Sequence, residues 1–146
     1  MVKKYELKNG VAIIKKQDVQ EVGEYLKKVT DKNGGELTPE LIVNESKSEK
    51  SVLHQYFEWD NVKAGEKFRK HQARLIIGGV VEVVHSKGTS KNMRSWFSVK
   101  NEKGNQVYVT LQTVIKTPSY AQQMIRDAQQ YIKYLNDVLE MFYEHL

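Results

Sequence analysis

Cysteine is absent from this 146-residue chain, and proline occurs only twice. Without cysteine the chain can form neither disulfides nor thiolate metal sites, which suits a reducing compartment. The chain also lacks an apolar run as long as a membrane span, and its first residues, MVKKYELKNG, lack the apolar segment of a signal peptide. We therefore expect a cytoplasmic protein with no membrane partner.

Signatures of catalysis are missing as well. The four histidines show no spacing typical of metal ligands, no glycine-rich phosphate loop occurs, and no nucleophile elbow is present. The Glu-x-Lys spacing of some nucleases occurs at Glu6-Lys8 and Glu45-Lys47, but metal-dependent cleavage needs further carboxylates around the ion. We expect a protein that is not an enzyme and that binds no metal and no cofactor.

The charge of the chain is unevenly distributed. The net charge is +5, yet residues 61–100 contain nine Lys and Arg against two Glu, a net charge of +7. Residues 117–146 contain two Lys and Arg against four Asp and Glu, a net charge of −2. A concentrated basic segment suits a surface that binds polyanions, although a solvated basic face has the same composition.

The N-terminal part is expected to contain short helices. Asn9-Gly10 favours a small strand pair, or a loose arm, within residues 1–16. Asp18 is a suitable N-cap for a helix over 19–30, and Thr38-Pro39 is a strong start signal for a helix over 39–46. Another short segment follows at 52–57.

A basic helix is predicted next. Asp60 is a suitable N-cap, residues 62–77 carry apolar positions at a spacing of three to four with Lys and Arg between them, and Gly78-Gly79 ends the helix. The successive helices could form a helix-turn-helix in which 52–57 or 62–77 reads the nucleic acid, or they could simply cover a sheet.

The expected sheet spans about residues 80–115. The segment 80–85 is short and β-branched, 85–93 is polar and is expected to be a loop, and 94–100 and 106–115 are typical of strands. If Lys100 pairs with Asn105, Trp96 shares a face with Val107, Val109 and Leu111, whereas Phe97 and Tyr108 share the opposite face.

A long helix is predicted at the C-terminus. Thr117-Pro118 repeats the start signal, and apolar residues then recur at alternating steps of four and three, widened by a third apolar position in each heptad. About 28 helical residues would span about 42 Å, long for a domain of this size. We expect residues 1–116 to form one α+β domain and 117–146 to pack on it or to form a homodimer, through Tyr131, Leu135, Val138, Leu139, Phe142 and Leu146.

Residues 51–84 contain Leu53-His54, Phe57-Glu58-Trp59-Asp60, Ala64, Phe68-Arg69 and Gln72-Ala73-Arg74. This pattern resembles a family of small phage and prophage proteins of no settled function, which implies a location in the host cytoplasm if a phage encodes the chain. The chain departs from the family pattern at Val52, Asn61, Gly65 and Phe68, none of which removes a charged or aromatic anchor. The resemblance covers roughly residues 37–146 and implies a phage context, a strand hairpin and a C-terminal helix.

Together these features predict a phage-type accessory protein that binds nucleic acid without catalysing a reaction. DNA is the nucleic acid that we expect it to bind. Its surface would combine basic side chains with aromatic rings that stack on bases, namely Lys63, Lys67, Arg69, Lys70, Arg74, Lys87, Lys91, Arg94, Phe97, Lys100 and Tyr108. We expect Trp59 and Trp96 to be core anchors. The alternatives are a module that binds or inhibits a host or phage protein, and a structural component of the virion.

Overall fold

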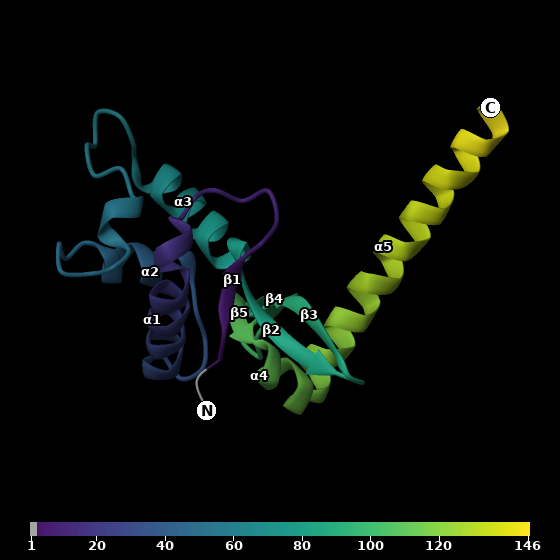
Figure 1. The fold of residues 1–146 in the computed structure, drawn as a ribbon, viewed down its shortest axis with the longest axis horizontal. Coiled ribbons are helices and arrows are strands. Elements are labelled where there is room, and N and C mark those ends of the chain that lie inside the picture. Colours follow the sequence, from purple (N-terminus) through teal and green to yellow (C-terminus); the bar gives the residue numbers. More distant parts are fainter. Residues whose placement is uncertain (1–2) are drawn as a thin grey trace.

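The computed structural model describes residues 3–146 and has the expected α+β architecture, with short helices first, strands in the middle and one long helix last (Figure 1). The first two helices form where the sequence predicts them, but the Asp18 carboxylate accepts from the Tyr56 hydroxyl and does not cap α1. Helix α1 (Val19–Lys32) buries the face that carries Val22, Leu26 and Val29, and a 3₁₀ turn, η1 (Lys16–Asp18), precedes it. In α2 (Pro39–Ser46) the Thr38 hydroxyl caps the first turn by accepting from the Leu41 N–H at 3.2 Å.

The basic helix begins four residues later than predicted. Helix α3 spans Glu66–Gly79, whereas Asp60 caps no helix and instead closes a local turn, its carboxylate accepting from the Val62 N–H at 2.9 Å. Val62 is 96% exposed and belongs to no apolar face. Residues 47–65, including the 3₁₀ turn η2 (His54–Tyr56), separate α2 from α3. The two helices therefore lack the turn of about three or four residues that defines a helix-turn-helix.

The first strand pairs with a distant part of the chain. Strand β1 (Tyr5–Leu7) lies antiparallel to β2 (Val80–Ser86), with Glu6 opposite Val81. The expected strand pair within residues 1–16 is therefore wrong, because residues 11–14 form no strand. Gly10, at φ 81°, instead turns the chain away from the sheet.

The segment expected to be a loop is a strand. Residues Thr89–Arg94 form β3, which pairs with β2 through a two-residue turn at Lys87 and Gly88, whose φ angles are 51° and 76°. Positive φ at both central positions is typical of the hairpin turn that matches strand twist. Because every residue of β3 is exposed, the strand carries no apolar alternation that the sequence could reveal.

The second sheet has a register one residue away from the expected one. Strand β4 (Trp96–Lys100) pairs with β5 (Gln106–Thr110) so that Lys100 lies opposite Gln106 rather than Asn105. Residues 111–115 do not continue the strand but lie in α4 (Leu111–Lys116), whose first turn is capped by Thr110. The shift places Phe97 and Tyr108 on opposite faces of the sheet, contrary to the prediction.

Two apolar clusters hold these elements together. The larger one surrounds Trp96, which is completely buried, donates from Nε1 to the Thr30 hydroxyl at 3.0 Å and stacks on the Tyr5 ring. The Tyr5 ring lies directly against Gly23 of α1, where any side chain would collide with it. The smaller cluster contains Val99, Val107, Val109 and Val114 and lies on the other face of the β4–β5 sheet. Two backbone hydrogen bonds between Leu37 and Tyr108 join the segment before α2 to strand β5.

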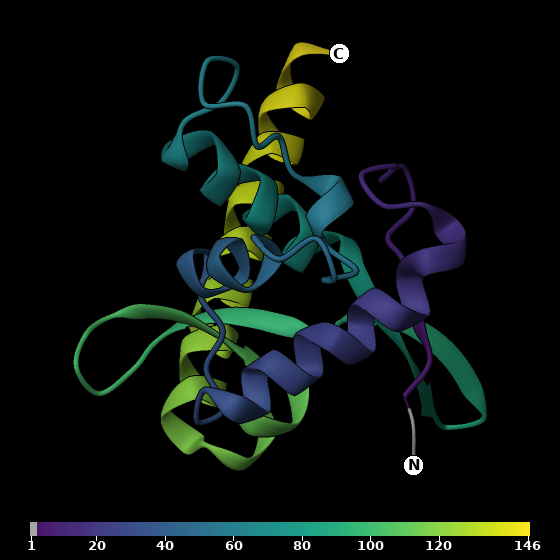
Figure 2. The same ribbon diagram turned by 90° about the vertical axis from the view of Figure 1, so that its left-hand side faces the viewer.

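Helix α5 (Pro118–His145) packs on the rest of the protein only near its first turns. Tyr120 and Met124 contact the smaller cluster, and no residue of the 28-residue helix is buried. The helix then extends away from the body (Figure 1). In Figure 2, seen from the side of the short helices, it lies behind α3. Within residues 3–146, no helix combines the length and the apolar composition that crossing a lipid bilayer requires.

Candidate nucleic-acid interface

The side chain of Arg69, expected to bind nucleic acid, is buried inside the protein. Its guanidinium donates to the carbonyl oxygens of Glu58 at 3.3 Å and Ala64 at 3.2 Å, and to the Asn61 Oδ1 at 2.8 Å. The prediction for Arg69 is therefore wrong, because its donors fasten the turn over residues 58–64 to α3. Only about a tenth of the side chain is exposed.

Trp59 and His54 add further contacts around Arg69. Trp59 stacks on the His54 imidazole, with 5.1 Å between ring centroids and 10° between planes, and the Arg69 guanidinium lies 5.5 Å from the Trp59 ring. The Trp59 Nε1 donates to the His54 carbonyl at 2.9 Å, and the His54 Nδ1 lies 2.8 Å from the Ser46 carbonyl oxygen. We call this set of contacts the Trp59 lock. It supports a structural role for Trp59, which is half-buried. The complete burial of Trp96 in the larger apolar cluster supports the same role for that residue.

The cations that remain on α3 share one face. Lys67 and Arg74 are exposed at positions i and i+7, and His71 lies between them at i+4, so the three side chains project from the same side of the helix. Lys70 borders this face and pairs with Glu40 at 3.4 Å, which leaves it partly neutralised. No acidic group lies within 4.0 Å of Lys67 or Arg74 in the part of the chain that the structure describes.

At the C-terminal end of α3 this face meets two cations from other elements. Lys8, from the turn after β1, and Arg94, at the end of β3, line a cavity of about 410 Å³ together with Arg74. Leu75 and Ile13 supply part of its apolar wall, and the Arg94 guanidinium lies close to Gly78, about 3.6 Å from where a side chain would begin. None of the three cations forms an ion pair within residues 3–146. We call Lys8, Lys67, Lys70, Arg74 and Arg94 the α3 cationic face.

Sequence reasoning missed Lys8. The residue lies far from the basic segment in the chain, and only the pairing of β1 with β2 brings it to the end of α3. The Lys8 N–H donates to the Gly79 carbonyl at 2.9 Å, which fixes the turn beside the last residue of the helix. A sequence signal for this pairing did not exist, because β1 is three residues long and its partner lies more than 70 residues away.

Several other predicted residues lie apart from the α3 cationic face. Lys63 is in the exposed turn before α3, Lys87 is at the tip of the β2–β3 hairpin, and Lys91 alternates with Arg94 and so projects from the opposite face of that hairpin. Lys100 lies next to α5, where its backbone exchanges two hydrogen bonds with the Gln123 amide. These residues do not form one continuous surface with Arg74.

The two predicted stacking residues are largely packed inside the protein. Phe97 contacts the smaller apolar cluster, whereas Tyr108 contacts the larger one from the other face of the sheet. Both side chains are half-buried. They therefore cannot present neighbouring rings to successive bases, as the predicted register required.

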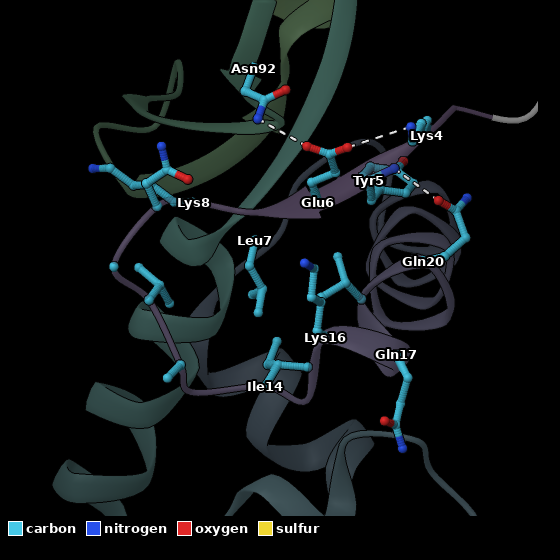
Figure 3. A pocket seen from close by; sticks show the side chains of 15 residues that line it. Lys4, Tyr5, Glu6, Leu7, Lys8, Ile14, Lys16, Gln17, Gln20 and Asn92 are labelled. Atoms are coloured by element: carbon cyan, nitrogen blue, oxygen red, sulfur yellow. Dashed lines mark hydrogen bonds and ion pairs between the residues drawn. The ribbon is translucent and has the colours of Figure 1, made fainter.

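A larger cavity, of about 680 Å³, runs beside β1 (Figure 3). Some of its polar groups bond to one another: the Glu6 carboxylate accepts from the Asn92 amide at 3.0 Å and lies 3.5 Å from the Lys4 ammonium. The Gln20 amide oxygen accepts from the Tyr5 N–H at 2.9 Å. Lys8 lines this groove as well as the smaller cavity, and Lys16 and Gln17 line it with no side-chain partner among the described residues. The smaller cavity differs in that two arginines line it.

The two tyrosines whose pKa values are raised most, Tyr5 and Tyr56, lie outside the α3 cationic face. Burial raises the pKa of Tyr5 to about 12, and the nearby Glu82 carboxylate adds to this shift. The pKa of Tyr56 also rises to about 12, through burial and a hydrogen bond to the Asp18 carboxylate. Within residues 3–146, no group of three or more His, Asp or Glu side chains is arranged to hold a metal ion.

The six residues expected at an oligomer interface lie together on the projecting part of α5. Tyr131, Leu135, Leu139 and Phe142 are between 41% and 63% exposed, and Leu146 is 99% exposed. Val138 is half-buried. Comparison with models of known protein families, with curated proteins and with solved structures finds no match for this chain.

Proposed function

We propose that this chain is a phage-type accessory protein that binds nucleic acid through the α3 cationic face and without catalysing a reaction. DNA is the nucleic acid that we expect it to bind. The observation that carries the proposal is the cavity at the end of α3. Arg74 and Arg94 come from different elements, line the same cavity as Lys8, and have no acidic partner within 4.0 Å among the described residues.

The arrangement suits a phosphate backbone for two physical reasons. First, Lys67 and Arg74 are separated by about two helical turns, about 10 Å along the axis, so the face can contact more than one phosphate. Second, an Arg guanidinium presents a planar set of donors that matches a phosphate. Two guanidinium groups beside one cavity can donate to the same phosphate or to neighbouring ones. The apolar wall at Leu75 and Ile13 could lie against a sugar or a base.

The proposal predicts affinity that depends steeply on salt. A surface that neutralises about four phosphates releases their counterions, so affinity should fall about 150-fold between about 50 mM and 200 mM salt. The measurement is a titration of the full chain against double-stranded DNA, single-stranded DNA and RNA at both salt concentrations. Because the contacts are to phosphates, we expect little dependence on base sequence.

A matched pair of variants locates the surface. Arg74→Glu with Arg94→Glu should abolish binding, because it places two anions at the cavity. Lys47→Glu with Lys50→Glu makes the same change in total charge on an exposed loop outside the cationic face and should retain most of the binding. Equal losses in the two variants would overturn the assignment of the surface, and no binding of the wild-type chain to any of the three nucleic acids at low salt would overturn the function.

A second candidate function is that of a protein-interaction module, such as an adaptor or an inhibitor. The observation that favours it is the apolar, unpacked length of α5, which resembles a docking element more than part of a core. The cationic face could equally dock on an acidic protein. A structural component of the virion is the third candidate, and it would form large regular assemblies.

A further inference from the structure

The projecting part of α5 presents an apolar surface that the rest of the chain does not cover. Most of the large hydrophobic side chains that are exposed in residues 3–146 lie between Ile125 and Leu146. A large side chain of this kind offers on the order of 100 Å² when about half exposed, so the stretch presents roughly 1,000 Å² in total. That exceeds the largest apolar patch on most monomers, about 300–600 Å².

The stripe begins inside the protein. Met124 packs against the smaller apolar cluster, and Ala128, Tyr131, Leu135 and Val138 follow on the same side of the helix at steps of four and three. The residues that make an intramolecular contact at the base of α5 are thus continuous with those that make none further out. Tyr134 and Met141 project sideways, about 100° or more around the helix from Leu135, and without them the stretch offers roughly 800 Å², the area per partner of a stable protein–protein interface.

The charges of α5 argue against a lipid surface as the occupant. Helices that lie on membranes typically carry Lys and Arg on the polar face. From residue 117 onward the chain has two basic residues, Arg126 and Lys133, and four acidic ones, Asp127, Asp137, Glu140 and Glu144. A net charge of −2 would be repelled by anionic lipids.

We propose that a second copy of this chain covers the stripe, through an antiparallel pair of α5 helices centred near Leu135. The uncovered stretch runs from Ile125 to Leu146, so its midpoint lies at Leu135 and Asn136. Two copies bury the whole stretch of each other only when the twofold axis passes through that midpoint, and each residue then meets its counterpart in a self-complementary interface.

The direction of the pair follows from where the globular bodies lie. The charged residues Arg126, Lys133, Asp137 and Glu144 project from the side of the helix opposite Leu135, and Lys133 pairs with Asp137 of its own helix at 3.8 Å, so they stay in solvent in either direction. A parallel pair would bring the two globular bodies together at one end. The antiparallel pair places the bodies at opposite ends, where they cannot collide, and opposes the two helix dipoles.

The register pairs side-chain sizes as well. Ala128, the smallest member of the stripe, lies level with Phe142 of the partner helix, so a small residue faces a large one near each end of the contact. The stripe is wider than the seam of a two-stranded coiled coil, since Ile132 and Leu139 flank it. A pair of helices therefore leaves an apolar flank on which two such pairs can join.

Light scattering on the full chain at micromolar concentration tests the pairing. We expect a mass of twice 17.0 kDa or a higher even multiple. Leu135→Glu should reduce the mass to that of a single chain, because it sets two carboxylates at the twofold axis. Leu75→Glu, an equal change at an exposed leucine of α3, should leave the assembly intact. A single-chain mass for the wild type, or an assembly unaffected by Leu135→Glu, would overturn the proposal.

The absence of cysteine allows the orientation to be tested directly. Under mild oxidation, Ala128→Cys alone should not crosslink, whereas a mixture of Ala128→Cys and Phe142→Cys chains should form a disulfide between unlike chains. A parallel pair gives the reverse result, with Ala128→Cys crosslinking to itself. Crosslinking of Ala128→Cys alone, with none in the mixture between unlike chains, would overturn the antiparallel arrangement even if the chain is a dimer.

Discussion

The segment around Trp59 and the distal part of α5 reverse the roles that their residue types suggest. The first is rich in aromatic and charged residues of the kind that bind ligands, yet its Trp, His and Arg side chains bond to one another and to the backbone. The second carries Leu, Ile, Phe and Tyr, the usual material of a core, and none of its residues is buried.

The difference shows that a side chain's role depends on whether its bonding capacity is used inside the chain. Arg69 and Arg74 lie five positions apart on one helix. The donors of Arg69 are directed to carbonyl and amide oxygens at the start of α3, whereas Arg74 projects beside Lys8 and Arg94 with no anionic partner within residues 3–146. Residue type alone does not distinguish the two.

The largest effect is expected from the core on which both regions depend. Trp96→Ala should lower the free energy of unfolding by about 3–5 kcal/mol, because it leaves a cavity and deprives the Thr30 hydroxyl of its donor. Urea denaturation followed by circular dichroism measures the loss. A change below about 1 kcal/mol would mean that the cluster around Trp96 is not the principal core.

The two arginines of α3 give the sharpest test of the comparison. Arg69→Met should cost about 2 kcal/mol of unfolding free energy, because it removes three hydrogen bonds and the contact with Trp59. Arg74→Met should change stability by less than about 0.5 kcal/mol and should weaken nucleic-acid binding. The same denaturation and titration experiments measure both. Equal losses of stability in the Arg69→Met and Arg74→Met variants would contradict the structural role assigned to Arg69.

A pH dependence should follow from the tyrosine beside Gly23. The pKa of Tyr5 is raised to about 12 in the folded chain, so above pH 10 the unfolded chain loses this proton first. Tyr5 should therefore contribute a loss of stability, at most about 1.4 kcal/mol per pH unit, as pH rises from 10 towards 12. Denaturation at several pH values measures it, and Tyr5→Phe should flatten the decline. An identical slope in the variant would contradict the shift.

The smallest effect on the fold is expected at the distal end of α5. Leu139→Glu with Phe142→Glu should leave the fluorescence of Trp59 and Trp96 unchanged, since neither substituted residue contacts either apolar cluster. Weaker DNA binding by this variant would link α5 to the cationic face through assembly. A shifted tryptophan spectrum would show instead that α5 supports the body.

The fold class, α1, α2 and the long last helix were predictable because their signals are local. Thr38-Pro39 and Thr117-Pro118 mark helix starts, and the apolar periodicity of α1 and α5 extends over several turns. The start of α3 was not predictable, because Asp60 can close a turn as readily as it can cap a helix. The Lys87-Gly88 turn was a usable signal for the β2–β3 hairpin, but polar residues on both sides concealed it.

The remaining features could not be predicted from the sequence because they depend on contacts that are distant in the chain or on a single turn. The register of β4 and β5 depends on whether Lys100 pairs with Asn105 or with Gln106. A shift of one residue changes the cross-strand partner of every residue in the two strands. The start of α4 at Leu111 depends on the Thr110 cap, within a segment whose composition favours a strand. For the candidate site, Lys67, Lys70, Arg74 and Arg94 were predictable from charge clustering. Lys8 and the burial of Arg69 follow from tertiary contacts alone.

The position of Trp96 has a consequence for folding during synthesis. The main apolar cluster contains residues from Tyr5 onward, but its largest side chain is Trp96, whose hydrogen-bond partner Thr30 is 66 positions earlier in the chain. Helices α1, α2 and α3 therefore leave the ribosome before the largest side chain of the cluster that they share. Until about two thirds of the chain has emerged, their apolar faces remain open to chaperones, and closure waits for contacts of long sequence separation, which form slowly.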